Sequence, residues 1–71
     1  MLKAQREQHE LIKSRLRLAG SSLAIIAREL GLSPTTVTIV SQGVRRSQRI
    51  ESAIAAKLGV PVATLWPEKY I

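Results

Sequence analysis

Residues 23–43 read LAIIARELGLSPTTVTIVSQG and decide the fold of this chain of 71 residues. The pattern predicts two short helices joined at Gly31, because glycine has no Cβ and readily takes the positive φ of a helix end. Ser33 is a favourable N-cap, and Pro34 fits the first helical position, where no backbone N–H is needed. The second helix therefore begins almost as soon as the first ends, which favours a sharp crossing of the two.

The second helix of this pair has two different faces. Val37 and Val40 are three residues apart and are expected to face the core. The opposite face carries Thr35, Thr36, Thr38, Ile39 and Gln42. These residues are uncharged and mostly β-branched, so a purely structural helix has little use for them. Hydroxyl and methyl groups presented outward suit the edges of base pairs in a major groove. The predicted base contacts are Thr35, Thr36, Thr38 and Ile39.

The formal net charge of +6, with a pI near 10.9, favours a polyanion as partner. Residues 1–20 contain five basic and two acidic residues, and residues 44–58 contain four basic residues and one acidic residue. Residues 21–43 carry no net charge. We therefore expect the flanks to bind phosphates while the second helix reads bases. Arg28 is a weaker phosphate candidate, and the alternative is that it pairs within its own surface. The predicted phosphate contacts are Ser22, Leu23, Ser33, Gln42, Arg45, Arg46 and Arg49.

The segment before the pair predicts another helix, from residue 6 to about residue 19. Gly20 ends it, and Ser21 and Ser22 offer an N-cap for the next helix. Residues 1–5 show no strong pattern and are expected to be flexible. The stripe predicted to face the core comprises Leu11, Ile12, Arg15 and Leu16.

The segment after the pair predicts one longer helix and a final helical turn. Residues 44–48 form a basic loop in which Ser47 is the N-cap of a helix that ends at about Leu58. The apolar stripe of this helix is Ile50, Ala53, Ile54 and Leu58. The final turn spans residues 62–66, and Trp66 is interpreted as a core anchor, with a dimer contact as the alternative. We expect one all-α domain over residues 1–71, a compact bundle of about five short helices.

These five helices resemble the lambda-repressor-like domains. Spacings typical of a helix-turn-helix, over about residues 23–42, are occupied by Ala27, Gly31, Val37 and Val40. More specifically, residues 33–37 (SPTTV) and 65–70 (LWPEKY) are similar to the matching segments of the Ner-like regulators. This family includes the Mu-type phage repressor Ner and the bacterial Nlp proteins. The resemblance covers roughly residues 9–70.

The resemblance implies a phage or prophage transcriptional repressor that inserts the helix at about residues 34–42 into the major groove of operator double-stranded DNA. One short chain touches few base pairs, so we expect a homodimer on a pseudo-palindromic operator. In the lambda-like class the first residue of the preceding helix is often Gln, which braces the recognition residues, whereas this chain has Leu23. Backbone N–H groups at that helix start still suit a phosphate.

Two other binding functions stay open. One is a protein-interaction module of the same fold, antitoxin-like or an accessory subunit, without specific DNA binding. The other is RNA binding, although two aromatic residues in the C-terminal tail form no stacking platform.

No enzyme, catalytic residue, metal site, cofactor or small-molecule ligand is expected. One histidine, five glutamates, no aspartate and no cysteine leave no acid–base pair or metal cluster to nominate. His9 is interpreted as a partly exposed polar residue. The chain has no membrane-spanning apolar run and no signal-peptide core, so we expect a cytoplasmic, nucleoid-associated protein of a bacterial host cell.

Overall fold

The computed structural model describes residues 3–69, and the side chains of residues 7–69. Five α-helices and no β-strand occur in this part of the chain, which confirms the predicted all-α class. The helices are α1 (Lys3–Leu18), α2 (Leu23–Leu30), α3 (Pro34–Ser41), α4 (Gln48–Leu58) and α5 (Val62–Leu65), followed by the 3₁₀ turn η1 (Pro67–Lys69). Met1, Leu2 and Tyr70 lie outside the described residues, and with them part of the predicted flexible start and of the LWPEKY tail.

Three boundaries differ from the prediction. α1 begins at Lys3, three residues earlier than expected, and α5 ends at Leu65, one residue earlier than expected. The 3₁₀ turn η1 begins at Pro67, where we expected the helical structure to end. The N-caps at Ser22, Ser33 and Ser47 are confirmed, because each side chain accepts a hydrogen bond from the backbone N–H three residues later.

The turn between α2 and α3 is closed by two backbone hydrogen bonds. The N–H of Gly31 donates to the carbonyl of Arg28 at 3.2 Å, and the N–H of Leu32 donates to the carbonyl of Ala27 at 2.8 Å. This is the Schellman arrangement, and it requires the left-handed conformation that Gly31 adopts, with φ 72° and ψ 30°. Only residues 31–33 separate the two helices, so the chain changes direction within three residues.

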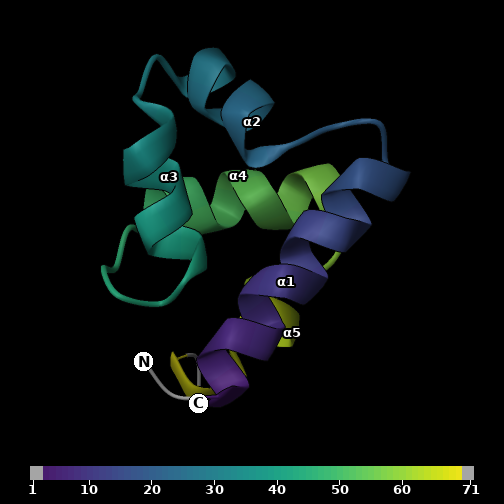
Figure 1. The fold of residues 1–71 in the computed structure, drawn as a ribbon, viewed down its shortest axis with the longest axis vertical. Coiled ribbons are helices and arrows are strands. Elements are labelled where there is room, and N and C mark those ends of the chain that lie inside the picture. Colours follow the sequence, from purple (N-terminus) through teal and green to yellow (C-terminus); the bar gives the residue numbers. More distant parts are fainter. Residues whose placement is uncertain (1–2, 70–71) are drawn as a thin grey trace.

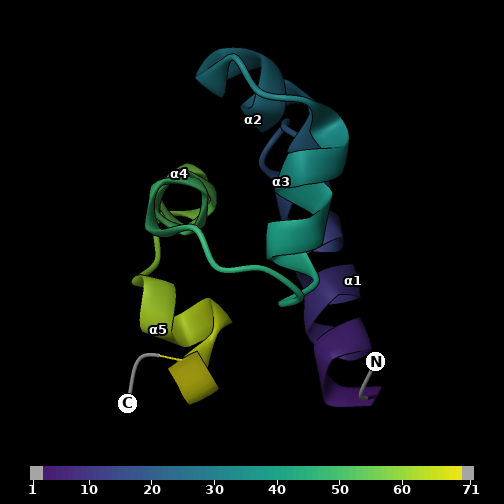
Figure 2. The ribbon, with the colours of Figure 1, turned by 90° about the vertical axis from the view of Figure 1, so that its left-hand side faces the viewer.

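Figure 1 shows α4 crossing the middle of the molecule, with α2 on one side of it and α1 and α5 on the other. In Figure 2, α4 is seen end-on, while α3 and α1 run along the opposite side of the molecule. The side chains between these elements form one hydrophobic core. Its buried members are Ile12, Leu16, Leu23, Ile26, Ala27, Val37, Val40, Ile50, Ile54, Ala55, Leu65 and Trp66.

The apolar stripe of α1 is narrower than predicted. Ile12 and Leu16 are fully buried, but Leu11 is 43% exposed and Arg15 is exposed. The remaining inward position is taken by His9, which is only 7% exposed, so its interpretation as a partly exposed residue was wrong. A helix lying on one side of a small core buries little more than a single row of side chains.

The prediction that Trp66 anchors the core is confirmed, since its side chain is 1% exposed. Its indole Nε1 has no hydrogen-bond partner in the described part of the chain, so the ring is held by apolar contact. The side-chain amide of Gln8, in α1, donates a hydrogen bond to the carbonyl of Leu65, the residue before Trp66. This bond links α1 to the end of α5. Trp66 therefore joins the C-terminal segment to the rest of the fold.

We expect Trp66→Ala to lower the free energy of unfolding by about 3 kcal/mol or more, because truncating a buried Trp leaves a large cavity. That is a large part of the roughly 4–10 kcal/mol available to a domain of this size. Urea denaturation followed by circular dichroism measures it. Leu18→Ala is the control, since Leu18 is 87% exposed and its truncation should change stability by less than about 0.5 kcal/mol. Equal effects of the two substitutions would show that Trp66 is not an anchor.

Candidate DNA interface

Helix α3 presents its predicted reading residues away from the core. Val37 and Val40 are 0% and 1% exposed, as predicted from their spacing. Thr35 is exposed, and Thr38 and Ile39 are half-buried on the same helix. The first turn and the middle of α3 therefore offer one hydroxyl-and-methyl face without charge.

Thr36 is partly committed to capping α3. The hydroxyls of Ser33 and Thr36 lie 2.9 Å apart in a hydrogen bond, and the N–H of Thr36 also donates to Ser33 Oγ at 3.3 Å. Both residues were predicted to contact DNA, Ser33 at a phosphate and Thr36 at a base. The structure brings them together as a mutual cap, so the Thr36 hydroxyl already has one partner before any DNA is bound.

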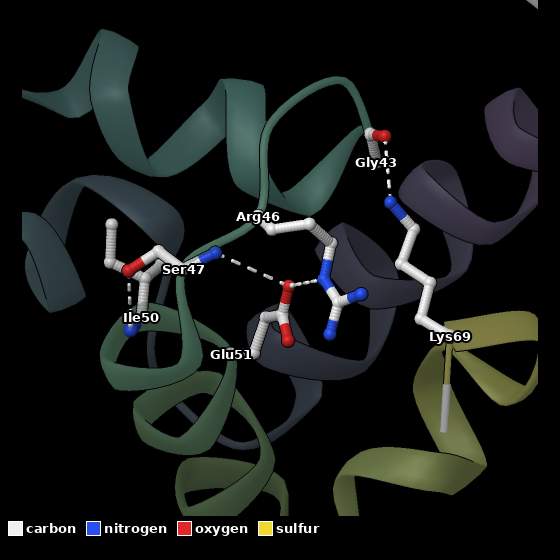
Figure 3. Close-up of polar contacts among 6 residues, drawn as sticks. All are labelled: Gly43, Arg46, Ser47, Ile50, Glu51 and Lys69. Atoms are coloured by element: carbon white, nitrogen blue, oxygen red, sulfur yellow. Dashed lines mark hydrogen bonds and ion pairs between the residues drawn. The ribbon is translucent and has the colours of Figure 1, made fainter. Parts of the chain in front are cut away.

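The loop after α3 is tied to the C-terminal segment. Gln42 is the C-cap of α3, and Gly43 follows it with a φ of 81°. The carbonyl of Gly43 accepts a hydrogen bond of 2.9 Å from Lys69 Nζ, which reaches across from η1 (Figure 3). The position of the loop thus depends on a residue 26 positions later in the chain.

A buried carboxylate anchors the other end of the same loop. Glu51 lies in the first turn of α4, and its side chain is 1% exposed. Its Oε2 accepts hydrogen bonds from Arg46 Nε at 3.1 Å and from the N–H of Ser47 at 3.4 Å (Figure 3). Arg46, predicted as a phosphate contact, is therefore held by α4 while half of its side chain stays exposed.

The three arginines predicted to bind phosphates occupy two places. Arg45 and Arg46 lie in the exposed loop after α3, whereas Arg49 lies on α4 beside the end of α2. The Arg49 guanidinium Nη2 donates to the carbonyl of Leu30 at 3.1 Å, which satisfies a carbonyl at the C-terminus of α2. Arg28, the weaker phosphate candidate, is exposed on α2.

The predicted contacts at the start of α2 lie close to the reading face. Ser22 Oγ accepts the N–H of Ile25 at 3.1 Å and so caps the helix. A surface depression of about 380 Å³ opens here, between the end of α1, the start of α2 and the middle of α3. It is lined by His9, Lys13, Arg17, Ser21, Ser22, Leu23 and Thr38. The structure thus brings the predicted phosphate contacts Ser22 and Leu23 together with the predicted base contact Thr38.

His9 connects α1 to the end of α3. Its Nδ1 lies 2.8 Å from Ser41 Oγ, in a hydrogen bond between two buried side chains. Burial lowers the pKa of His9 below its ordinary value of 6.5, and the nearby Lys13 ammonium lowers it further, while Glu10 opposes the shift. No group of three or more His, Cys, Asp or Glu among the described residues is arranged to hold a metal. His9 is therefore placed as a packing residue behind α3.

Comparison with known proteins assigns the family. Residues 7–71 match the winged helix-turn-helix DNA-binding family. The chain belongs to this family. No curated protein and no solved structure matches it. The chain is thus a helix-turn-helix DNA-binding domain.

The described part of this helix-turn-helix domain has two further features. Residues 3–69 contain no β-strand from which a wing could be built, and the loop of residues 42–47 and α4 follow α3 directly. Within the same residues, none of the helices combines the length and the apolar character needed to cross a bilayer.

Replacing Arg46 by Ala should lower the stability of the fold more than replacing the adjacent Arg45. Arg46→Ala deletes a donor to the buried Glu51 and should lower the free energy of unfolding by about 1–2 kcal/mol, the lower part of the range for charged hydrogen bonds because Arg46 is half exposed. Arg45→Ala should change stability by less than about 0.5 kcal/mol. Thermal denaturation of both variants tests this, and equal stabilities would mean that the Arg46–Glu51 contact contributes nothing measurable.

His9 should make stability depend on pH near neutrality. Because the folded protein lowers the pKa of His9, the unfolded chain binds this proton more tightly. The stabilisation is therefore fully present above the ordinary value of 6.5 and is lost as the pH falls through the lower, folded-state pKa. Chemical denaturation at about pH 7.5 and about pH 5.5 should show a loss in the wild type that is smaller in His9→Gln, which does not titrate. His9 is the chain's one histidine, so equal losses would contradict the assignment.

Proposed function

We propose that this chain is a sequence-specific transcriptional regulator that inserts α3 into the major groove of double-stranded operator DNA. The observation that carries the proposal is the uncharged outward face of α3, where Thr35, Thr38 and Ile39 lie over a buried row of valines. Threonine hydroxyls match donors and acceptors of base edges, and the Ile39 side chain matches the methyl of thymine. The N-terminal turn of such a helix commonly enters deepest into the groove.

The exposed arginine side chains beside this face support the same orientation. Arg45 and the exposed half of Arg46 lie in the loop that follows α3, next to the end of the reading helix. Phosphate contacts at this place fix the register of the protein on the duplex without carrying sequence information. Gln42 lies at the end of α3, and the start of α2 lies beside the middle of α3. We assign both to phosphates of the DNA backbone that flank the groove occupied by α3.

The finer assignment is a Ner-like repressor of a phage or prophage. It is supported by the similarity of residues 33–37 and 65–70 to Ner-like segments, and by the structural use of both segments here. Ser33 and Thr36 cap α3, and Trp66 and Lys69 hold the C-terminal turn against the core and the loop. Two copies on a pseudo-palindrome, acting in a bacterial cytoplasm, complete the proposal.

The deciding experiment compares Thr35→Ala and Ile39→Ala with the wild type on cognate and scrambled DNA at fixed salt. An operator is first located by footprinting of DNA from beside the gene. Each substitution should cost about 1–3 kcal/mol on the cognate site, and little on scrambled DNA, because neither residue is charged. Fluorescence anisotropy measures both affinities. Thr64→Ala, at an exposed threonine of α5, is the control and should leave the ratio of affinities unchanged.

Salt dependence separates DNA binding from the protein-interaction alternative. If each copy neutralises four or five phosphates, the logarithm of the affinity should fall against the logarithm of salt with a slope of roughly −4 per half-site. An unchanged cognate-to-scrambled ratio in both α3 variants would mean that α3 does not read the sequence. A slope near zero, together with salt-insensitive binding to a protein, would favour the protein-interaction module.

A further inference from the structure

The depression beside Thr38 has the character of an anion site. Lys13 and Arg17 line it from α1, one helical turn apart, and no acidic residue of the described part of the chain is among its lining residues. The pair places two positive side chains on one wall of a concave surface. Such a wall concentrates positive potential, since the low-dielectric protein behind it reduces screening.

The two cations differ in how they are engaged. Lys13 Nζ lies 3.3 Å from Glu10 Oε2, but both side chains are largely exposed, at 42% and 62%, so this ion pair is weak and easily exchanged. Arg17 is exposed in the last turn of α1, and no carboxylate in the described residues pairs with it. Arg17 is thus available for a bidentate contact to a phosphate.

Other residues that line the depression carry hydrogen-bonding groups. Ser21 Oγ is buried and has no hydrogen-bond partner in the described part of the chain. Ser22 and Leu23, at the start of α2, lie beside it, and the first amides of a helix favour a negative charge. An anion in the depression would therefore meet both positive charge and polar groups.

We propose that this depression binds a backbone phosphate of the DNA duplex, and that Lys13 and Arg17 are phosphate-binding residues. The inference rests on the proposed function, because Thr38 of the reading face forms one edge of the depression. A phosphate seated there lies on the α1 side of α3, whereas Arg45 and Arg46 follow the other end of the helix. The duplex then contacts the protein beside the middle of the reading helix and beyond its C-terminal end, and α1 becomes part of the DNA interface.

The distribution of the basic residues agrees with this assignment. In residues 44–58, Arg49 is bonded to the carbonyl of Leu30, and Lys57 pairs with Glu29 at 3.0 Å. Arg46 is bonded to Glu51. Much of the positive charge of that flank therefore has a structural partner. Arg17 of α1, in contrast, has no carboxylate partner in the described residues.

The test compares Arg17→Gln with Arg15→Gln. Both arginines are exposed in the last turn of α1, but only Arg17 lines the depression, so Arg15 controls for the loss of one charge. Arg17→Gln should make the salt slope shallower by about one and weaken binding about eightfold at 0.1 M salt, on cognate and scrambled DNA alike. Arg15→Gln should do neither. Thermal denaturation of both variants checks that the fold is intact.

Neutral methylphosphonate substitutions, placed one at a time along the operator, locate the contact. The wild type and Arg15→Gln should lose affinity at one phosphate flanking the read bases, and Arg17→Gln should be insensitive to that same substitution. If Arg17→Gln and Arg15→Gln behave identically while the wild type keeps its steep salt slope, this inference is wrong and the proposed function stands. A wild-type slope near zero removes the proposed function itself.

A titration with inorganic phosphate in the absence of DNA separates the two sources of the anion. Amide chemical shifts of Ser22 and Leu23 report on the depression. Small chemical-shift changes that do not saturate with phosphate concentration support a site that binds phosphate tightly only as part of the DNA duplex. Saturable shifts that Arg17→Gln abolishes, together with unchanged DNA binding of that variant, would assign the depression to a free phosphate compound and overturn the DNA assignment.

Discussion

The close packing of α2 on α3 is the contact on which the rest of the structure depends. Ala27 is fully buried where the helices meet, and its carbonyl accepts the N–H of Leu32, so one residue fixes both the approach of the helices and the turn between them. A larger side chain at this point would push α3 outward, because interiors at this density do not absorb extra volume. Helices α1, α4 and α5 and Trp66 complete the core beneath this pair. Three contacts also hold α3 or its loop: His9 of α1 binds Ser41, Glu51 of α4 binds Arg46, and Lys69 of η1 binds Gly43.

Local chemistry was sufficient to predict most of the helix boundaries. Serine caps and a helix-ending glycine act over three or four residues, so they are visible in the sequence without knowledge of the fold. The buried polar residues were not predictable in this way. His9, Ser41 and Glu51 are buried because each has a hydrogen-bond partner inside the protein. His9 and Ser41 are partners of each other and lie 32 positions apart in the chain. The only local signal was the inward helical spacing of His9 with Ile12 and Leu16.

The candidate interface was predictable in kind but not in arrangement. Charge in the sequence pointed to the two flanks, and the spacing of Val37 and Val40 indicated which face of α3 points outward. Sequence alone grouped Arg45, Arg46 and Arg49, whereas the structure gives Arg46 and Arg49 partners in different elements. The approach of α1 to Thr38 depends on the tertiary fold, so the sequence did not indicate that Arg17 lies beside this residue of α3.

The mutual cap of Ser33 and Thr36 limits how this surface can diverge. Thr35 and Ile39 make no hydrogen bond within the described protein through their side chains, so exchanges there leave the helix intact and alter only what it meets. Thr36 is different, because its hydroxyl and its N–H both bind the Ser33 side chain. Under the proposed function, a lineage acquiring a new target would vary positions 35 and 39 freely while retaining a hydroxyl at position 36. The DNA sequences that its members recognise would then differ through positions 35 and 39, while position 36 stays the same in all of them.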